Sequence, residues 1–252
     1  VASGGGAGKA LAEWVLAGEQ PMDLWSIDIR RFAPFHSDDA LLRARIPEEL
    51  GLHYAIHYPG REPTTARDLR KGALHERLAV KGAQFGARMG WERANWFAGP
   101  GDVLPAPLRF GKPAWFDAVA RECRTAREDV ALFDQSSFAK IMVEGADAED
   151  YLQRVAAADV SGEPGRVIYT GMLNERGGYE SDLTIFKVAA DRYLIITGTS
   201  QPTHDMRSGM FNPRRPCATR SDMQYAVALG LTHEFRAFDM KRHCFINPAH
   251  LT

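Results

Sequence analysis

The stretch YTGMLNERGGYESDLTIFKV, residues 169–188, decides the fold that we predict for this chain. Two apolar runs flank residues 174–178, and the glycine pair that ends this segment supplies the positive-φ positions of a tight reversal. The stretch therefore predicts a β-hairpin. On its return strand, Asp182 and Thr184 have the same parity and share a face, which places Asp182 beside Tyr169 of the facing strand. The residues expected to be buried are Leu183, Ile185 and Val188.

Spacing alone favours an ordinary surface hairpin whose aspartate is solvated. The order of residues is more specific. The run Tyr-Thr-x-Met-Leu-Asn-Glu-x-Gly-Gly-x-x-x-Asp-Leu-Thr, residues 169–184, closely resembles the folate-binding domain shared by the glycine-cleavage aminomethyltransferase and the dimethylglycine and sarcosine dehydrogenases. The resemblance implies that Asp182 faces the tetrahydrofolate amine that captures a one-carbon unit. It also implies that Tyr169, Leu173 and Thr184 line the folate pocket.

Composition indicates a globular chain without a strong charge bias. The 252 residues are 45% hydrophobic, enough for a sizeable core in one large or two smaller domains. A formal net charge of −1 argues against a general nucleic-acid-binding surface. No apolar run approaches the roughly 20 residues of a membrane span, and the three cysteines form no CxxC pair. We therefore expect free thiols and a cytoplasmic protein, or a mitochondrial matrix protein in a eukaryote.

Residues 3–18, SGGGAGKALAEWVLAG, predict a glycine-rich turn that leads into a helix closed by Gly18. Such a turn presents bare backbone amides at the positive end of the helix, which suits an anionic or carbonyl-rich ligand. A P-loop is excluded because that motif needs glycine at position 3, which is Ser3, and Ser or Thr at position 10, which is Ala10. Composition alone leaves a flexible linker as the alternative.

This N-terminal segment resembles the last helix of the flavin domain in the dimethylglycine and sarcosine dehydrogenases, where a glycine-rich turn approaches FAD. The resemblance implies that the cofactor-binding positions are Gly4, Gly5, Gly6, Gly8 and Lys9. It also implies that FAD is bound mainly by an upstream region. We therefore expect an internal fragment of a longer protein, inactive by itself.

Residues 31–98 resemble the small linking domain between the flavin and folate modules of that family. Within them the patterns predict a helix from Ser37 to Ile46 ended by Pro47, a strand over residues 52–58, and a second helix opened by Thr64 or Thr65. His53 and His57 share a face of that strand but lie too far apart for one metal ion. The aromatic residues expected in the core are Trp91, Trp96 and Phe97.

A Gly- and Pro-rich loop over residues 99–113 marks a boundary. Apolar residues then recur at helical spacing from Trp115 to Cys123, so we expect that thiol to be packed. Residues 131–145 predict a strand and a glycine turn, followed by a helix capped by Asp147, and they resemble the opening of the folate domain. The resemblance makes Phe138 a candidate for the pterin-side wall, with plain core packing as the alternative.

Residues 192–197 predict a further strand, after which the resemblance stops. The histidines and cysteines beyond residue 203 match no zinc spacing, so we propose no metal site and expect a weakly ordered ending. The predicted fold class is α+β. Its parts are the end of an FAD-dependent oxidoreductase domain (1–32), a linking domain (33–98), a partial folate-binding aminomethyltransferase-like domain (99–203) and an atypical tail (204–252).

The resemblance implies a flavoprotein that oxidises the N-methyl group of dimethylglycine, sarcosine or a related small amine. Hydride would pass to FAD, and tetrahydrofolate would capture the resulting carbon. Two alternatives stay open. An aminomethyltransferase acting on a lipoyl-carried amine would use the same hairpin but leaves residues 3–98 unexplained. The second alternative is a non-catalytic relative, because a regulatory phosphatase subunit shares this architecture. Neither nucleic acid nor membrane is an expected partner, and the electron acceptor is left unassigned.

Overall fold

The computed structural model describes residues 2–18, 20–174, 177–207 and 227–229. It has the predicted α+β fold. In chain order the elements are α1 Gly4–Ala17, η1 Trp25–Ile27, η2 Ile29–Arg31, η3 Pro34–Ser37, α2 Asp39–Leu52, α3 His75–Val80, β1 Ala83–Arg88, β2 Trp91–Phe97, α4 Phe116–Glu128, β3 Ala139–Glu144, α5 Ala148–Val155, β4 Val167–Leu173, β5 Tyr179–Ala189, β6 Arg192–Thr197, α6 Pro202–Arg207 and β7 Val227–Leu229. Most of the tail expected after residue 203 lies outside the described residues.

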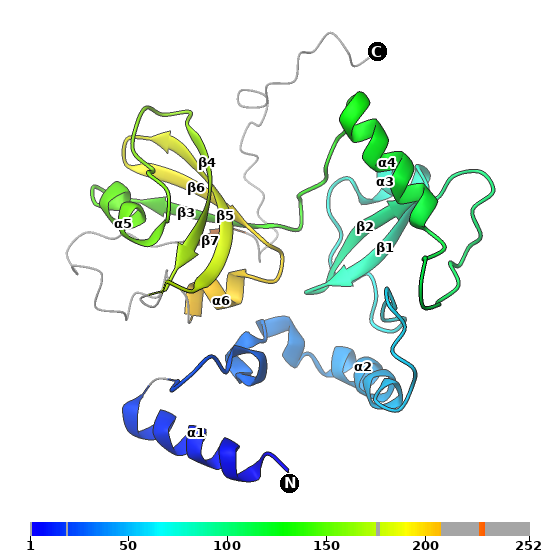
Figure 1. The fold of residues 1–252 in the computed structure, drawn as a ribbon, viewed down its shortest axis with the longest axis horizontal. Helices are drawn as coiled ribbons and strands as arrows, with labels where there is room; N and C mark the ends of the chain where they lie inside the picture. Colours follow the sequence, from blue (N-terminus) through cyan, green and yellow to red (C-terminus); the bar gives the residue numbers. More distant parts are fainter. Residues whose placement is uncertain (1, 19, 175–176, 208–226, 230–252) are drawn as a thin grey trace.

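The main sheet has five antiparallel strands in the order β4-β5-β6-β3-β7 (Figure 1). The predicted hairpin is confirmed as β4 and β5, in which Tyr169 pairs with Thr184 and Gly171 with Asp182. The strand predicted over residues 192–197 is β6, which pairs with both β5 and β3. The hairpin is therefore held at one edge of a larger sheet.

The core lies between this sheet and α5, whose Leu152 is fully buried. Leu183 and Ile185 are buried as predicted, but Val188 is only half-buried. Lys187 takes the inward position because it keeps the period-2 alternation that Val188 breaks. Its ammonium group pairs with the Glu149 carboxylate of α5. The core residues are Ile141, Val143, Ala148, Leu152, Val155, Val160, Ile168, Met172, Leu183, Ile185, Tyr193 and Ile195.

A smaller unit consists of the β1–β2 hairpin with α3 and α4 against it (Figure 1). Met89 and Gly90 form its two-residue turn, with φ angles of 49° and 77°, as a type I′ reversal requires. Of the three aromatic residues expected in the core, Trp96 is buried, whereas Trp91 and Phe97 are half-buried. Cys123 of α4 is exposed, so the expectation that it is packed was wrong.

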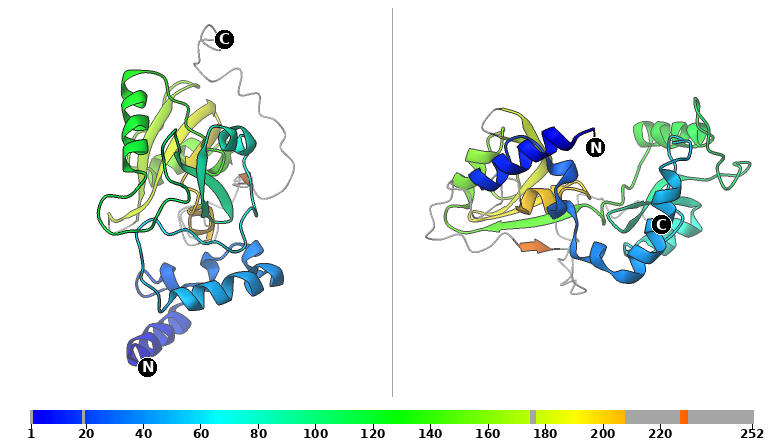
Figure 2. Two further views of the ribbon diagram at one scale, coloured as in Figure 1. Left: turned by 90° about the vertical axis from the view of Figure 1, so that its right-hand side faces the viewer. Right: turned by 90° about the horizontal axis from the view of Figure 1, so that it is seen from below.

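The N-terminal helices α1 and α2 lie on one side of both units, as two views show (Figures 1 and 2). The glycine-rich segment is not a turn before a helix: it forms the first turns of α1. Ala7 N–H already donates to the Ser3 carbonyl over 2.8 Å, because the Ala, Lys and Leu residues that follow favour the helix. Gly18 ends the helix with a φ of 76°, as predicted.

The helix predicted from Ser37 to Ile46 begins and ends elsewhere. Asp38 is the N-cap, and its Oδ1 accepts from Leu41 N–H over 2.9 Å. Pro47 lies inside α2, where it removes one helical hydrogen bond. The helix continues because Glu48, just after Pro47, is anchored from outside: Thr64 N–H donates to Glu48 Oε1 over 2.7 Å.

Residues 52–58 do not form the predicted strand: α2 runs to Leu52, and no described strand pairs with the residues after it. Thr64 and Thr65 do not open a helix either. Both donate to the Glu48 carboxylate, and Ala66 and Asp68 then adopt φ angles of 47° and 63°, which a right-handed helix does not allow. Partners distant in sequence have overridden the local signals.

Candidate functional site

Tyr169 and Asp182 form the centre of the candidate site, on the face of the β4–β5 hairpin opposite the core. The Tyr169 hydroxyl donates to Asp182 Oδ2 over 3.1 Å. The two residues are diagonal neighbours, since Asp182 pairs with Gly171, two positions beyond Tyr169. Both side chains are exposed, Tyr169 by 71%. The hydrogen bond to Asp182 raises the pKa of the Tyr169 phenol, with the carboxylate charge adding to the effect.

Tyr179 is a member of this face that the sequence analysis did not single out. Its ring covers Gly171, so tightly that a Cβ at Gly171 would collide with the ring. Tyr179 also makes a small electrostatic contribution to the raised pKa of Tyr169. The two tyrosines therefore lie close to Asp182, one on each strand. A glycine in the middle of a strand was the available signal, because it often marks the close approach of another group.

The other predicted folate residues have different positions. Thr184 is half-buried and lies directly opposite Tyr169, so it belongs to the same face. Leu173 follows an irregularity in the β4–β5 register and pairs with Tyr179. Phe138 precedes β3, which β6 separates from β5, and the Arg93 guanidinium lies 5.4 Å from the centre of its ring. The structure thus brings Tyr169, Asp182 and Thr184 together, and Phe138 lies two strands away.

A buried polar cluster lies behind Asp182. Ser181 Oγ is 3.1 Å from both Thr197 Oγ1 and Asp205 Oδ2, and Thr197 Oγ1 donates to the Asp182 carbonyl over 3.2 Å. All three side chains are almost fully buried. Sequence reasoning missed this cluster, because its members come from β5, β6 and α6 and nothing local marks a buried serine or threonine.

The positions predicted to approach FAD form an exposed surface on α1. A Cβ added at Gly4, Gly5, Gly6 or Gly8 would meet nothing within 4 Å, and Lys9 Nζ lies 3.7 Å from Glu13 Oε1. The backbone there is accessible, but no described residue encloses a ligand against it. The described residues therefore do not by themselves build a flavin site.

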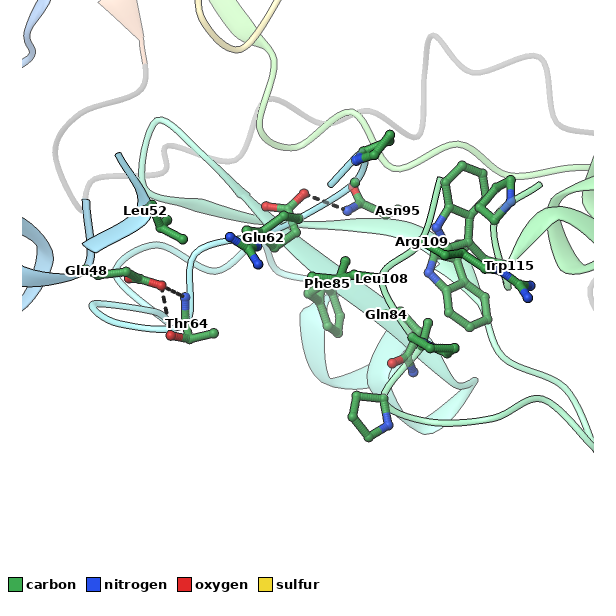
Figure 3. A pocket seen from close by; sticks show the side chains of 18 residues that line it. Glu48, Leu52, Glu62, Thr64, Gln84, Phe85, Asn95, Leu108, Arg109 and Trp115 are labelled. Carbon is green, nitrogen blue, oxygen red and sulfur yellow. Dashed lines mark hydrogen bonds between the residues drawn. The ribbon is translucent and has the colours of Figure 1, made fainter. Parts of the chain in front are cut away.

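A separate cavity of about 850 Å³ lies between the end of α2, the β1–β2 hairpin and the loop before α4 (Figure 3). Its carboxylates already have partners: Glu48 accepts from Thr64 N and Oγ1 over 2.7 and 2.8 Å, and Glu62 accepts from Asn95 Nδ2 over 3.1 Å. Burial opposes ionisation of Glu48, but the hydrogen bonds from Thr65 and Thr64 lower its pKa to about 2. None of the predicted site residues lines this cavity.

Two absences apply to the described part of the chain. No group of three or more His, Cys, Asp or Glu side chains could hold a metal ion there. Nor does that part contain a helix long and apolar enough to cross a membrane.

The antiparallel sheet backed by α5, with its tyrosine–aspartate pair, lies within a part of the chain that a family model matches. Residues 74–227 match the family model described as the GCVT N-terminal domain. The chain belongs to this family. Residues 17–71 match a second model, the FAD dependent oxidoreductase central domain. The first match runs past residue 203, where the sequence analysis had the resemblance end.

Three curated relatives are similar to this chain over about three quarters or more of its length. The chain is 44% identical over 192 residues to 4-methylaminobutanoate oxidase (formaldehyde-forming) of Paenarthrobacter nicotinovorans, covering 76% of this chain and 23% of that protein. It is 37% identical over 206 residues to the mitochondrial pyruvate dehydrogenase phosphatase regulatory subunit of Mus musculus (80% and 24%). It is 36% identical over 211 residues to mitochondrial sarcosine dehydrogenase of Homo sapiens (74% and 23%).

The chain thus spans about a quarter of the length of these relatives. Among solved structures, glycine cleavage system aminomethyltransferase T from Bartonella henselae matches 56% of this chain and 34% of its own, with 26% identity and a TM-score of 0.44.

Proposed function

We propose that this chain belongs to a flavin-dependent N-demethylating dehydrogenase that passes a one-carbon unit to tetrahydrofolate. The Tyr169–Asp182 pair on the open hairpin face is the observation that carries the folate half of the proposal. The flavin half rests on the match of residues 17–71 and on the relatives named an oxidase and a sarcosine dehydrogenase. The substrate class proposed is a small amine bearing an N-methyl group.

For the folate half, Asp182 has the required geometry. One carboxylate oxygen, Oδ2, accepts the Tyr169 hydroxyl over 3.1 Å, and this fixes the orientation of the group. The other oxygen is available to accept the proton that a secondary amine of tetrahydrofolate loses when it attacks an electrophilic carbon. Tyr169 and Tyr179 offer aromatic surface on either side for a flat pterin ring. We propose Thr184, Leu173 and Phe138 as further parts of the pocket.

Bound FAD would supply the two-electron oxidation of the amine. We propose that most of its binding surface lies outside the described residues, with Gly4, Gly5, Gly6, Gly8 and Lys9 contributing an accessible edge. The division of the chain at residues 32, 98 and 203 likewise remains a proposal. The boundary between the two family matches, at residues 71–74, lies inside the proposed linking segment.

A second candidate is a regulatory subunit without this chemistry, and the 37% identity to the mouse phosphatase regulatory subunit favours it. An aminomethyltransferase acting on a carrier-bound amine would use the same hairpin, but it would not account for the flavin-domain match of residues 17–71. The two candidates differ from the dehydrogenase in that neither requires flavin reduction.

Isothermal titration with 5-formyltetrahydrofolate, a stable folate probe, tests the folate half on the 252-residue chain. Asp182→Ala should weaken binding at least tenfold while leaving the melting temperature almost unchanged, because the side chain is exposed. Loss of the folded protein in that variant would show a structural aspartate instead. For the flavin half, native polypeptide from source cells should show flavin absorbance that bleaches with sarcosine or 4-methylaminobutanoate. Native protein without flavin would favour the regulatory candidate.

A further inference from the structure

The buried cluster behind Asp182 is a continuous hydrogen-bonded chain that ends on the Asp182 backbone. Asp205, 2% exposed, accepts from Ser181 Oγ over 3.1 Å. Ser181 and Thr197 have their hydroxyl oxygens 3.1 Å apart, and Thr197 reaches the Asp182 carbonyl over 3.2 Å. Two hydroxyl protons serve three contacts. Once Ser181 donates to Asp205, the Thr197 proton is shared between Ser181 Oγ and the Asp182 carbonyl, so each link depends on the next.

The other end of the chain reaches the segment that matches the flavin-oxidoreductase family. His204 Nδ1–H donates to Asp205 Oδ1 over 3.1 Å, and its Nε2 lies 3.5 Å from Glu180 Oε2. The ring also makes an edge contact with Trp25 of η1, at 4.9 Å between centroids. Among the described residues, the charged groups facing His204 include Asp205 of α6, Glu180 of β5 and Asp23, which precedes η1. The hydrogen bond to Asp205 raises the pKa of His204 against the effect of burial, and Glu180 and Asp23 add to the rise.

We infer that Asp205 is a positioning residue that fixes the β5 backbone at Asp182 through Ser181 and Thr197, and that His204 links this support to Trp25. The inference rests on the proposed role of Asp182 and deepens it. The Tyr169 hydrogen bond orients the Asp182 carboxylate relative to β4, but no packing holds this exposed side chain, so a rigid backbone beneath it is needed for productive geometry. The buried chain supplies that rigidity and connects it to the residue 17–71 segment.

Two matched variants test the inference, because β6 and the residues after it offer two buried threonines. Thr197→Val removes the hydroxyl next to Asp182 and should weaken binding of 5-formyltetrahydrofolate about fivefold to tenfold. Thr199→Val is the control: Thr199 is also buried, and its Oγ1 has a single hydroxyl partner, Ser137 Oγ, at 3.1 Å. It should weaken binding less than about twofold for a similar loss in melting temperature. Equal weakening in both variants would overturn the inference.

The pH profile supplies a readout that a merely structural residue would not move. In the wild-type chain, affinity for 5-formyltetrahydrofolate should fall as the pH rises above the ordinary histidine pKa of about 6.5, because His204 loses its proton. In His204→Gln, which keeps a hydrogen-bond donor but cannot titrate, this fall should disappear. A wild-type and variant profile with the same slope would overturn the role of His204.

Hydrogen exchange separates failure of this inference from failure of the proposed function. If Asp182→Ala binds the folate probe like wild type, or the wild-type chain does not bind it, the folate proposal fails. The exchange rates of the amides of residues 182–184 still test the positioning chain. Faster exchange there in Thr197→Val than in Thr199→Val supports the inference, and equal rates contradict it.

Discussion

The hydroxyl of Tyr169 donates a hydrogen bond to Oδ2 of Asp182 across 3.1 Å, between two strands that also pair through their backbones. The sheet therefore fixes the two backbone positions, and the χ1 and χ2 torsions of each side chain complete the geometry. The bond occupies one carboxylate oxygen and leaves the second open to solvent. Because both side chains are exposed, the folding of the hairpin does not depend on this hydrogen bond.

Removing the tyrosine hydroxyl tests that relationship. Tyr169→Phe should weaken binding of 5-formyltetrahydrofolate about threefold to tenfold, because the variant lacks the hydroxyl that orients the Asp182 side chain. The melting temperature should stay unchanged, because Tyr169 is 71% exposed. Tyr54→Phe is the matched control, since Tyr54 is 90% exposed and lies outside the site. Equal affinities for Tyr169→Phe and wild type would contradict a binding role for the hydroxyl.

The Gly171–Tyr179 contact predicts a second effect at the same face. Gly171→Ala should displace the Tyr179 ring and lower the unfolding free energy by about 1–3 kcal/mol. It should also weaken the binding of 5-formyltetrahydrofolate. Gly51→Ala provides the comparison, because an added Cβ in α2 meets nothing within 4 Å and alanine favours a helix by roughly 0.5–1 kcal/mol. Denaturant titration of both variants measures the difference. An unfolding free energy of Gly171→Ala equal to that of wild type would mean that the Tyr179 ring moves aside without loss of stability.

The ion pair between Arg67 and Glu92 should be essential to the smaller unit. Arg67 Nε donates to Glu92 Oε1 over 2.9 Å, Asp68 N–H donates to the same oxygen over 2.8 Å, and the Glu92 side chain is 2% exposed. Glu92→Ala leaves a half-buried guanidinium without its carboxylate and should cost about 3–5 kcal/mol of unfolding free energy.

The pair formed by Arg192 and Glu144 serves as the control, with Nε and Oε1 2.8 Å apart and both side chains about half exposed. Glu144→Ala should cost less than about 1 kcal/mol in the same denaturant titration. A small effect for Glu92→Ala would show that water enters and solvates Arg67.

Glu48 predicts a pH dependence of stability. Its pKa falls from 4.5 to about 2 on folding, because hydrogen bonds from Thr65 and Thr64 outweigh burial. A lowered carboxyl pKa stabilises the folded state above pH 4.5, and this contribution is lost as the pH falls towards 2. Over that window wild type should lose about 2–3 kcal/mol relative to Glu48→Gln, which has no charge to lose. Parallel stability curves for the two proteins would contradict the assignment.

Local sequence determined the elements whose partners are also local. The β4–β5 hairpin, β6 and α4 were predictable because alternation with period two or a helical spacing is a property of consecutive residues. The strand parity that placed Asp182 and Thr184 on one face has the same origin. The prediction that Val188 is buried was wrong, because Val188 has the opposite parity to Leu183 and Ile185. Lys187 has the matching parity, so its side chain points inward and forms an ion pair with Glu149.

Tertiary structure decided what depends on partners distant in sequence. Thr64 and Thr65 look like helix starts but bind Glu48, and α2 continues through Pro47 because other segments anchor it. The chain from Asp205 to Asp182 exists only because the strand order places β5 next to β6. The physical reason is that a buried hydroxyl or carboxylate takes whichever partner packing brings within hydrogen-bond distance, and no local pattern encodes that neighbour.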